Sequence, residues 1–145
     1  MEHSLIDLEN QTNYKVNLDL LEKIASEFNT SDIELIICNN EYIKEINSQY
    51  RQKDSATDVL SFPFENEFNL PNIPLGSIII SIDFVESKAK EFGHNSDDEL
   101  TLLFIHGLLH LLGFDHEIDS GEHREKEEEI LNKYNLPKSL IVRNS

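Results

Sequence analysis

Apolar residues in the first part of the chain follow two different patterns. Residues 3–8 (HSLIDL) and 33–38 (IELIIC) are short apolar runs of the kind found in strands. Residues 17–28 between them place Leu, Ile and Phe at helical spacing. This part of the chain therefore predicts a strand, a helix and a second strand.

The next segment repeats the alternation of helix and strand. Residues 41–50 (EYIKEINSQY) put their apolar side chains on one side of a helix, directly after Asn39 and Asn40, a good capping pair. Residues 58–64 (DVLSFPF) and 75–81 (LGSIIIS) are rich in Val, Ile and Phe and predict two more strands.

The second half of the chain has helical patterning almost to its end. Residues 81–92 predict a helix closed by Gly93. Ser96 and Glu99 form a capping-box pattern, with Ser96 as N-cap, for the next helix. Residues 120–134 predict the last helix, and the acidic run over 117–129 is expected to be a solvated helix face.

These elements predict an α+β fold in one domain spanning residues 1–145. We expect a small mixed sheet of about four strands packed against about five helices, one of them a zincin-like metal helix. A chain of 145 residues is long enough for one hydrophobic core and too short to argue for two.

Composition narrows the class of protein. The chain has 28 acidic and 12 basic residues, a net charge of −16, which argues against broad nucleic-acid binding but leaves local basic patches open. Cys38 is the only cysteine, so no intrachain disulfide or thiolate metal cluster can form. The N-terminus lacks signal-peptide features and no apolar run reaches the roughly 18 residues of a membrane span. We expect a cytoplasmic protein without a membrane partner; the pattern does not indicate its oligomeric state.

The motif HGLLHLLGFDH, residues 106–116, predicts a metal site. His106 and His110 are four residues apart and share one helix face. Gly113 allows the positive φ at which the helix can end, so that the chain folds back and presents His116 as a third ligand. Three imidazoles leave a fourth tetrahedral position open, as in catalytic zinc sites. Zn²⁺ is expected, although Ni²⁺ and other divalent ions also suit imidazole.

The spacing matches the metzincin protease signature H-E-x-x-H-x-x-G-x-x-H with one departure, because Gly107 replaces the glutamate base. A water at this site would be activated mainly by the metal, or by a group from elsewhere. Asp115 and Glu117 flank His116 and are candidates to orient an imidazole, or are simply exposed. The other histidines lack such spacing and are expected to make ordinary hydrogen bonds: His3, His94 and His123.

The segment NSQYRQKDSATDVLSFPF, residues 47–64, places Arg51 and Lys53 in a helix-to-strand loop of an otherwise cation-poor chain. An arginine near a metal site could hold a phosphate and stabilise developing charge. The alternative is a helix C-terminal charge favoured by the helix dipole.

Together with LGSIIIS, these two motifs resemble the YbeY family of bacterial metal-dependent endoribonucleases over nearly the whole chain. The resemblance implies that His106, His110 and His116 are zinc ligands and that Arg51 takes part in activity. It also implies a single-strand-specific endoribonuclease that acts in 16S rRNA 3′-end maturation and in ribosome quality control. The partners that it implies are RNA, the small ribosomal subunit and associated factors. Family members often have Asp where Ser77 stands, so we assign Ser77 no catalytic role.

A local groove for single-stranded RNA needs cations and stacking rings. Arg51, Lys53, Lys88 and Lys90 are the candidate cations. Tyr50 and Phe64 are the candidate rings, although we expect both to belong to the core. Two other hypotheses stay open: a zinc hydrolase of another substrate, such as a peptidase, and a ribosome-associated factor with a purely structural metal.

Overall fold

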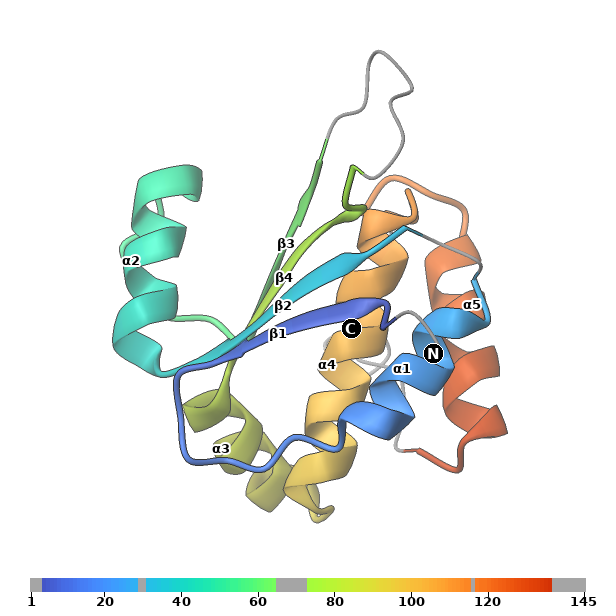
Figure 1. The fold of residues 1–145 in the computed structure, drawn as a ribbon, viewed down its shortest axis with the longest axis horizontal. Helices are drawn as coiled ribbons and strands as arrows, with labels where there is room; N and C mark the ends of the chain where they lie inside the picture. Colours follow the sequence, from blue (N-terminus) through green and yellow to red (C-terminus); the bar gives the residue numbers. More distant parts are fainter. Residues whose placement is uncertain (1–3, 29–30, 65–72, 116, 137–145) are drawn as a thin grey trace.

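The protein folds into a four-stranded sheet with five helices, as a computed structural model that describes residues 4–28, 31–64, 73–115 and 117–136 shows (Figure 1). The described elements follow in the order βαβαββααα. They are β1 (Ile6–Asn10), α1 (Leu18–Ser26), β2 (Ile33–Cys38), α2 (Asn40–Arg51), β3 (Val59–Pro63), β4 (Gly76–Ser81), α3 (Ile82–Phe92), α4 (Ser96–Leu111) and α5 (Glu122–Lys133).

The sheet is mixed and has the strand order β1-β2-β4-β3. β1, β2 and β4 are parallel, and β3 runs antiparallel to β4 at one edge. The two central strands carry nearly continuous apolar sequence, IELIIC and GSIIIS, because helices cover both of their faces. Leu35 pairs with Ile78 at the middle of this register.

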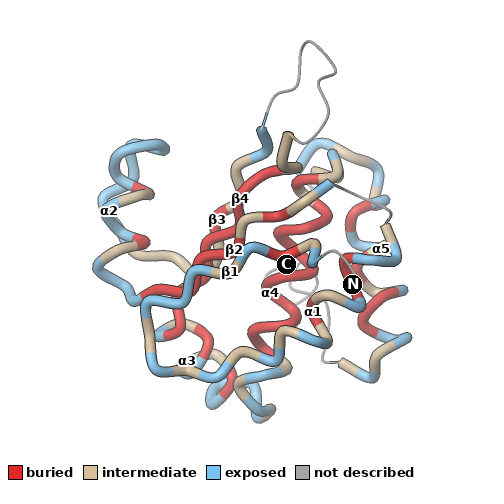
Figure 2. Tube along the Cα trace, viewed as in Figure 1, coloured by how far each residue is buried: buried red, intermediate tan, exposed pale blue. Residues whose placement is uncertain are grey.

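The larger core lies between the sheet and α4. From Glu99 to Leu111 every residue except His110 is buried, and Figure 2 shows α4 as the most buried helix. Ile78 and Ile80 face this core, whereas Ile79 belongs to a smaller cluster with Ile43 of α2. Because side chains alternate along β4, α2 and α4 pack on opposite faces of the sheet (Figure 1).

The prediction of an α+β fold with four strands in a mixed sheet and five helices is confirmed. Asn39 caps α2, its Oδ1 accepting the Tyr42 N–H at 3.0 Å, and Gly93 closes α3 at φ 73°, both as predicted. The N-cap of α4 was predicted one residue too late. Asn95 takes this place, because its Oδ1 accepts the Asp98 N–H at 2.8 Å.

The first strand also differs from its predicted bounds. β1 begins at Ile6 and extends to Asn10, whereas the apolar run predicted residues 3–8. The N–H groups of Leu5 and Ile6 donate to the carboxylate of Glu22 at 2.9 and 2.7 Å, so α1 holds the entrance to the strand. Within the described residues, no helix combines the length and apolar character needed to cross a membrane.

Candidate metal centre

The C-terminal half of α4 carries two of the predicted metal ligands. His106 is 7% exposed and His110 is half-buried, and their ring centroids are 5.0 Å apart. α4 ends two residues before Gly113, which adopts the positive φ of 100° that the motif predicted. The predicted third ligand, His116, lies outside the described residues.

A histidine from another helix completes a cluster that the sequence interpretation did not foresee. His123, in the first turn of α5, is fully buried, and its ring centroid is 4.7 Å from that of His106 and 4.8 Å from that of His110. One ring nitrogen from each of the three histidines lies within 4.8 Å of the others. His123 was expected to be an ordinary histidine, and the structure instead brings it to the predicted metal site.

This donor set fits a divalent metal ion. Zinc binds imidazole nitrogen at about 2.0–2.1 Å, which places the centroids of tetrahedral ligand rings roughly 5 Å apart. The three measured centroid separations, 4.7, 4.8 and 5.0 Å, agree with that value. The ligand nitrogens are spread over as much as 4.8 Å, so His106, His110 and His123 could hold one ion only after their side chains move closer together.

A buried carboxylate on α5 lies next to two of these histidines. Glu127 is fully buried, and its Oε2 accepts a hydrogen bond from His106 Nδ1 at 2.9 Å. The same oxygen is 3.7 Å from His123 Nε2. Metal-binding histidines commonly donate their second ring N–H to a carboxylate, which sets the tautomer and the ring orientation. Glu127 thus leaves Nε2 of His106 as the nitrogen available to an ion.

The position of Glu127 corrects the expectation of a solvated acidic face over residues 117–129. Many glutamates of this run do face solvent, but His123, Glu127, Ile130 and Leu131 are buried together on one side of α5. Their offsets of four, seven and eight residues form a helical stripe. This spacing could have predicted from the sequence that His123 and Glu127 are buried. It is hard to recognise because most of the neighbouring residues are charged.

Gly107 lies where α4 packs closely against the sheet. A Cβ at this position would be 3.1 Å from Cγ2 of Ile78 and 3.2 Å from Oγ of Ser61. The position therefore points at β3 and β4, where a glutamate side chain would collide with packed atoms. The geometry agrees with the absence of a protease-type base at residue 107.

The structure places the predicted RNA-contacting residues Arg51 and Lys53 at the end of α2. Both are exposed, and the Lys53 N–H closes the helix by donating to Asn47 O at 3.2 Å. Tyr50 is 61% exposed and Phe64 is 42% exposed, so the expectation that both belong to the core is wrong. Tyr50 contacts Phe62 of β3, with ring centroids 5.8 Å apart, which leaves most of its ring in solvent.

Two further lysines lie at a different place. Lys88 and Lys90 are on α3, which runs beside the beginning of α4, away from the end that carries the histidines (Figure 1). Lys88 forms an ion pair with Glu91 at 3.1 Å. The structure therefore does not bring this pair of lysines to the histidine cluster.

The predicted orienting residue Asp115 lies just after Gly113 and is half-buried. Its Oδ1 accepts the backbone N–H of Glu117 at 3.1 Å, and its carbonyl oxygen accepts the N–H of Asp119 at 3.0 Å. These bonds shape the turn that leads from α4 toward α5. The neighbouring Glu117 is exposed.

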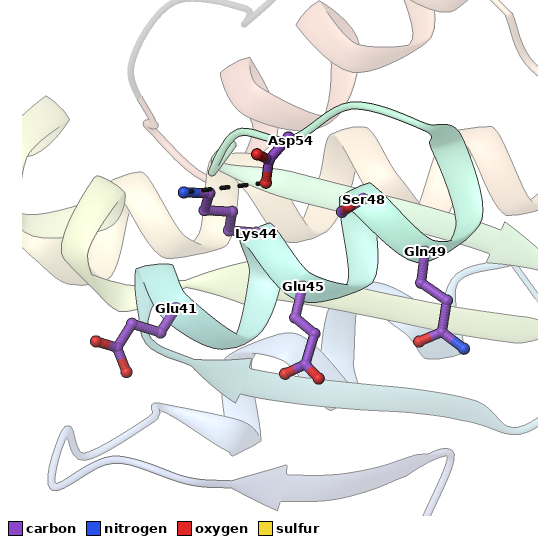
Figure 3. A pocket seen from close by; sticks show the side chains of 6 residues that line it. All are labelled: Glu41, Lys44, Glu45, Ser48, Gln49 and Asp54. Atoms are coloured by element: carbon purple, nitrogen blue, oxygen red, sulfur yellow. Dashed lines mark ion pairs between the residues drawn. The ribbon is translucent and has the colours of Figure 1, made fainter.

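A shallow hollow on the outer side of α2 offers no comparable chemistry. Figure 3 shows Glu41, Glu45 and Gln49 projecting from the same side of the helix, while Lys44 reaches toward Asp54. The Lys44–Asp54 separation is 4.0 Å, so the cation faces a carboxylate. This acidic hollow is poorly suited to a phosphate group, and it lies across the sheet from the histidines.

The chain is similar to known proteins in both sequence and fold. The family model of endoribonuclease YbeY matches residues 2–135. The protein named endoribonuclease YbeY from Sulfurovum sp. is 56% identical, over 98% of this chain and 99% of its own. Its namesake from Aliarcobacter butzleri is 60% identical, over 97% and 100%. The solution structure of TM1509 from Thermotoga maritima matches with a TM-score of 0.63 at 29% identity, over 90% of this chain and 91% of that one.

Proposed function

The chain belongs to the endoribonuclease YbeY family, and we propose that it is a metal-dependent endoribonuclease that cleaves single-stranded RNA. The proposed biological substrate is the 3′ end of 16S rRNA, with a role in ribosome quality control. The small ribosomal subunit and its associated factors are the proposed partners, and the cytoplasm is the proposed location.

The observation that carries this proposal is the pair of neighbouring histidines on α4, His106 and His110, with the buried Glu127 carboxylate accepting from His106 Nδ1. We propose His106, His110 and His116 as ligands of one ion per chain, with Zn²⁺ the expected ion and Ni²⁺ an alternative. A divalent ion at this site supplies Lewis-acid activation of water and of the phosphodiester. Glu127 holds His106 in the tautomer whose Nε2 can bind that ion.

The edge strand β3 provides a route between the cluster and the predicted RNA contacts. Ser61 faces Gly107 of α4, and the next residue, Phe62, contacts Tyr50 of α2. His110 lies one helical turn beyond Gly107, and Arg51 follows Tyr50 directly. An RNA strand lying across β3 would meet the histidines on one face of the sheet and the Arg51 guanidinium on the other. Arg51 would bind phosphate there, with Lys53 adding positive charge.

The geometry weighs against a peptidase. A zinc peptidase of the metzincin type needs a carboxylate after the first histidine, and position 107 faces Ile78 and Ser61 instead of the cluster. Glu127 is the buried carboxylate nearest to His106, and its Oε2 is engaged with His106 Nδ1. Cleavage of casein that disappears in His110→Ala would nevertheless restore the peptidase hypothesis.

The test is an RNA cleavage assay on matched preparations of wild type, His110→Ala and Arg51→Ala. Wild type loaded with zinc is expected to cut single-stranded ribosomal RNA, and His110→Ala is expected to lose the activity. Arg51→Ala is expected to keep the metal content of wild type and to cut more slowly. Equal cleavage by all three proteins would show a contaminating nuclease and would refute the proposal, as would intact RNA with metal-loaded wild type.

A further inference from the structure

We propose that His123 is itself a ligand of the metal ion in this chain, an inference that rests on the proposed metal-dependent function. The three-histidine motif of residues 106–116 does not include it, because His123 follows in the next helix. The cluster of His106, His110 and His123 nevertheless forms from described residues alone.

Position and burial support this role. His123 is the second residue of α5, and its fully buried imidazole faces the end of α4. Its centroid is nearly equidistant from those of His106 and His110, at 4.7 and 4.8 Å. Rings that converge on one ion have this arrangement, with centroids roughly 5 Å apart at zinc–nitrogen distances.

The carboxylate of Glu127 lies near His123 as well as near His106. The Nε2 atom of His123 lies 3.7 Å from Glu127 Oε2, the same carboxylate oxygen that accepts from Nδ1 of His106. One carboxylate therefore faces both imidazoles from the side of α5. An imidazole has two nitrogens, so each ring can meet the carboxylate with one and an ion with the other. Added to the proposed ligand His116, His123 would give the ion four imidazole ligands, so a water to be activated would have to bind as a fifth ligand or take the place of one imidazole.

Two measurements without RNA test this inference: zinc affinity by competition with a chromogenic chelator, and the number of imidazole ligands by X-ray absorption spectroscopy. The informative variant is His123→Gln, because the amide keeps a donor for Glu127 but removes the imidazole. His94→Gln is the matched control, because His94 Nε2 pairs with Glu99 at 2.7 Å, outside the cluster. Circular dichroism without metal will show whether the His123→Gln protein folds. If it does not, His123→Leu takes its place.

His123→Gln is expected to contain one imidazole fewer at zinc than wild type. We expect its zinc affinity to fall by at least the roughly 10–100-fold that loss of an orienting carboxylate costs, while His94→Gln matches wild type. An unchanged imidazole count in a folded His123 variant would overturn the inference. If the number of imidazole ligands falls in the His123 variant but no protein in the series cuts RNA, the proposed function is wrong, whereas His123 is still a metal ligand.

Discussion

At the scale of single residues, the site depends on a buried carboxylate in a helix dominated by exposed charge. Glu127 is fully buried, 2.9 Å from His106 Nδ1 and 3.7 Å from His123 Nε2. A charged group is rarely buried without a partner, and here the partners are two imidazoles of the cluster. Glu127 therefore links the packing of α5 to the proposed metal chemistry of α4.

Replacing Glu127 by Gln is expected to lower zinc affinity by about 10–100-fold, because the amide accepts from His106 less strongly than a carboxylate does. Chelator competition measures the effect. Glu125→Gln, an exposed position on the same helix, is the control and is expected to bind zinc as wild type does. Equal affinity of the Glu127→Gln protein and wild type would show that the carboxylate does not support the ligands.

Tyr50 is the residue whose exposure most favours RNA contact. At 61% exposure its ring can stack on a base, and stacking contributes about 1–3 kcal/mol per base. Tyr50→Ala is therefore expected to weaken binding of a single-stranded oligonucleotide by roughly five- to hundredfold, as measured by fluorescence anisotropy. Tyr50→Phe keeps the ring and should bind nearly as wild type. A Tyr50→Ala protein with undiminished affinity would exclude this ring from the RNA site.

At the scale of elements, α4 combines two tasks: one part of its surface packs against the sheet and another carries imidazoles. Gly107 makes the close approach possible, since a Cβ there would lie 3.1–3.2 Å from Ile78 and Ser61 atoms. Without that approach the histidines would stand further from β3 and from the residues of α2 beyond it.

Gly107→Glu is expected to destabilise the protein by about 1–3 kcal/mol or more, because it forces a long side chain into a packed contact. Urea unfolding measures the change. Ser48→Glu introduces the same side chain at an exposed position of α2 and is expected to be nearly neutral. A Gly107→Glu protein as stable as wild type, or one that gains peptidase activity, would contradict the packing argument.

The entrance to β1 gives a pH-dependent prediction. Burial raises the pKa of the Glu22 carboxyl, but hydrogen bonds from Ser4, Leu5 and Ile6 outweigh it, so the pKa lies below its ordinary 4.5. A lowered carboxyl pKa stabilises the fold above the unfolded-state value, and this stability is lost as the pH falls through the folded-state value.

Glu22→Gln is accordingly expected to cost about 1 kcal/mol at pH 7, and the cost is expected to shrink as the pH falls below 4.5, as measured by urea unfolding. Glu86→Gln, at an exposed position of α3, serves as the control. A difference between wild type and Glu22→Gln that stays constant from pH 7 to pH 3 would contradict this assignment.

The elements that could be predicted from the sequence are those whose apolar residues or glycines directly reflect the burial or the backbone conformation that the fold gives them. The apolar runs of β2 and β4 identify two buried strands from a few consecutive residues. In the same way, Gly93 and Gly113 mark the positive φ angles that follow two helices. His123 was missed because its partners are distant in sequence and meet it only when α5 packs on α4. The burial of Tyr50 was predicted wrongly because its spacing along the amphipathic helix is that of a buried residue. The sequence does not show that the sheet fails to cover this end of the helix.

At the scale of the whole molecule, the larger core consists of apolar side chains and contains none of the described histidines. One face of the sheet and the apolar side chains of α4, among them Leu103, Phe104 and Ile105, form one continuous cluster. The net charge of −16 leaves RNA affinity to a few local cations and rings. The metal is therefore expected to serve chemistry in a chain that is folded without it.

The most direct test removes the metal from wild type and then restores it, while folding and RNA cleavage are followed on the same sample. We expect the chelated protein to keep its circular dichroism spectrum and to lose cleavage of single-stranded RNA. Cleavage should return with one equivalent of zinc per chain, and not in His110→Ala. Unfolding on chelation would instead support a structural metal, and cleavage that persists without metal would contradict the metal-dependent mechanism.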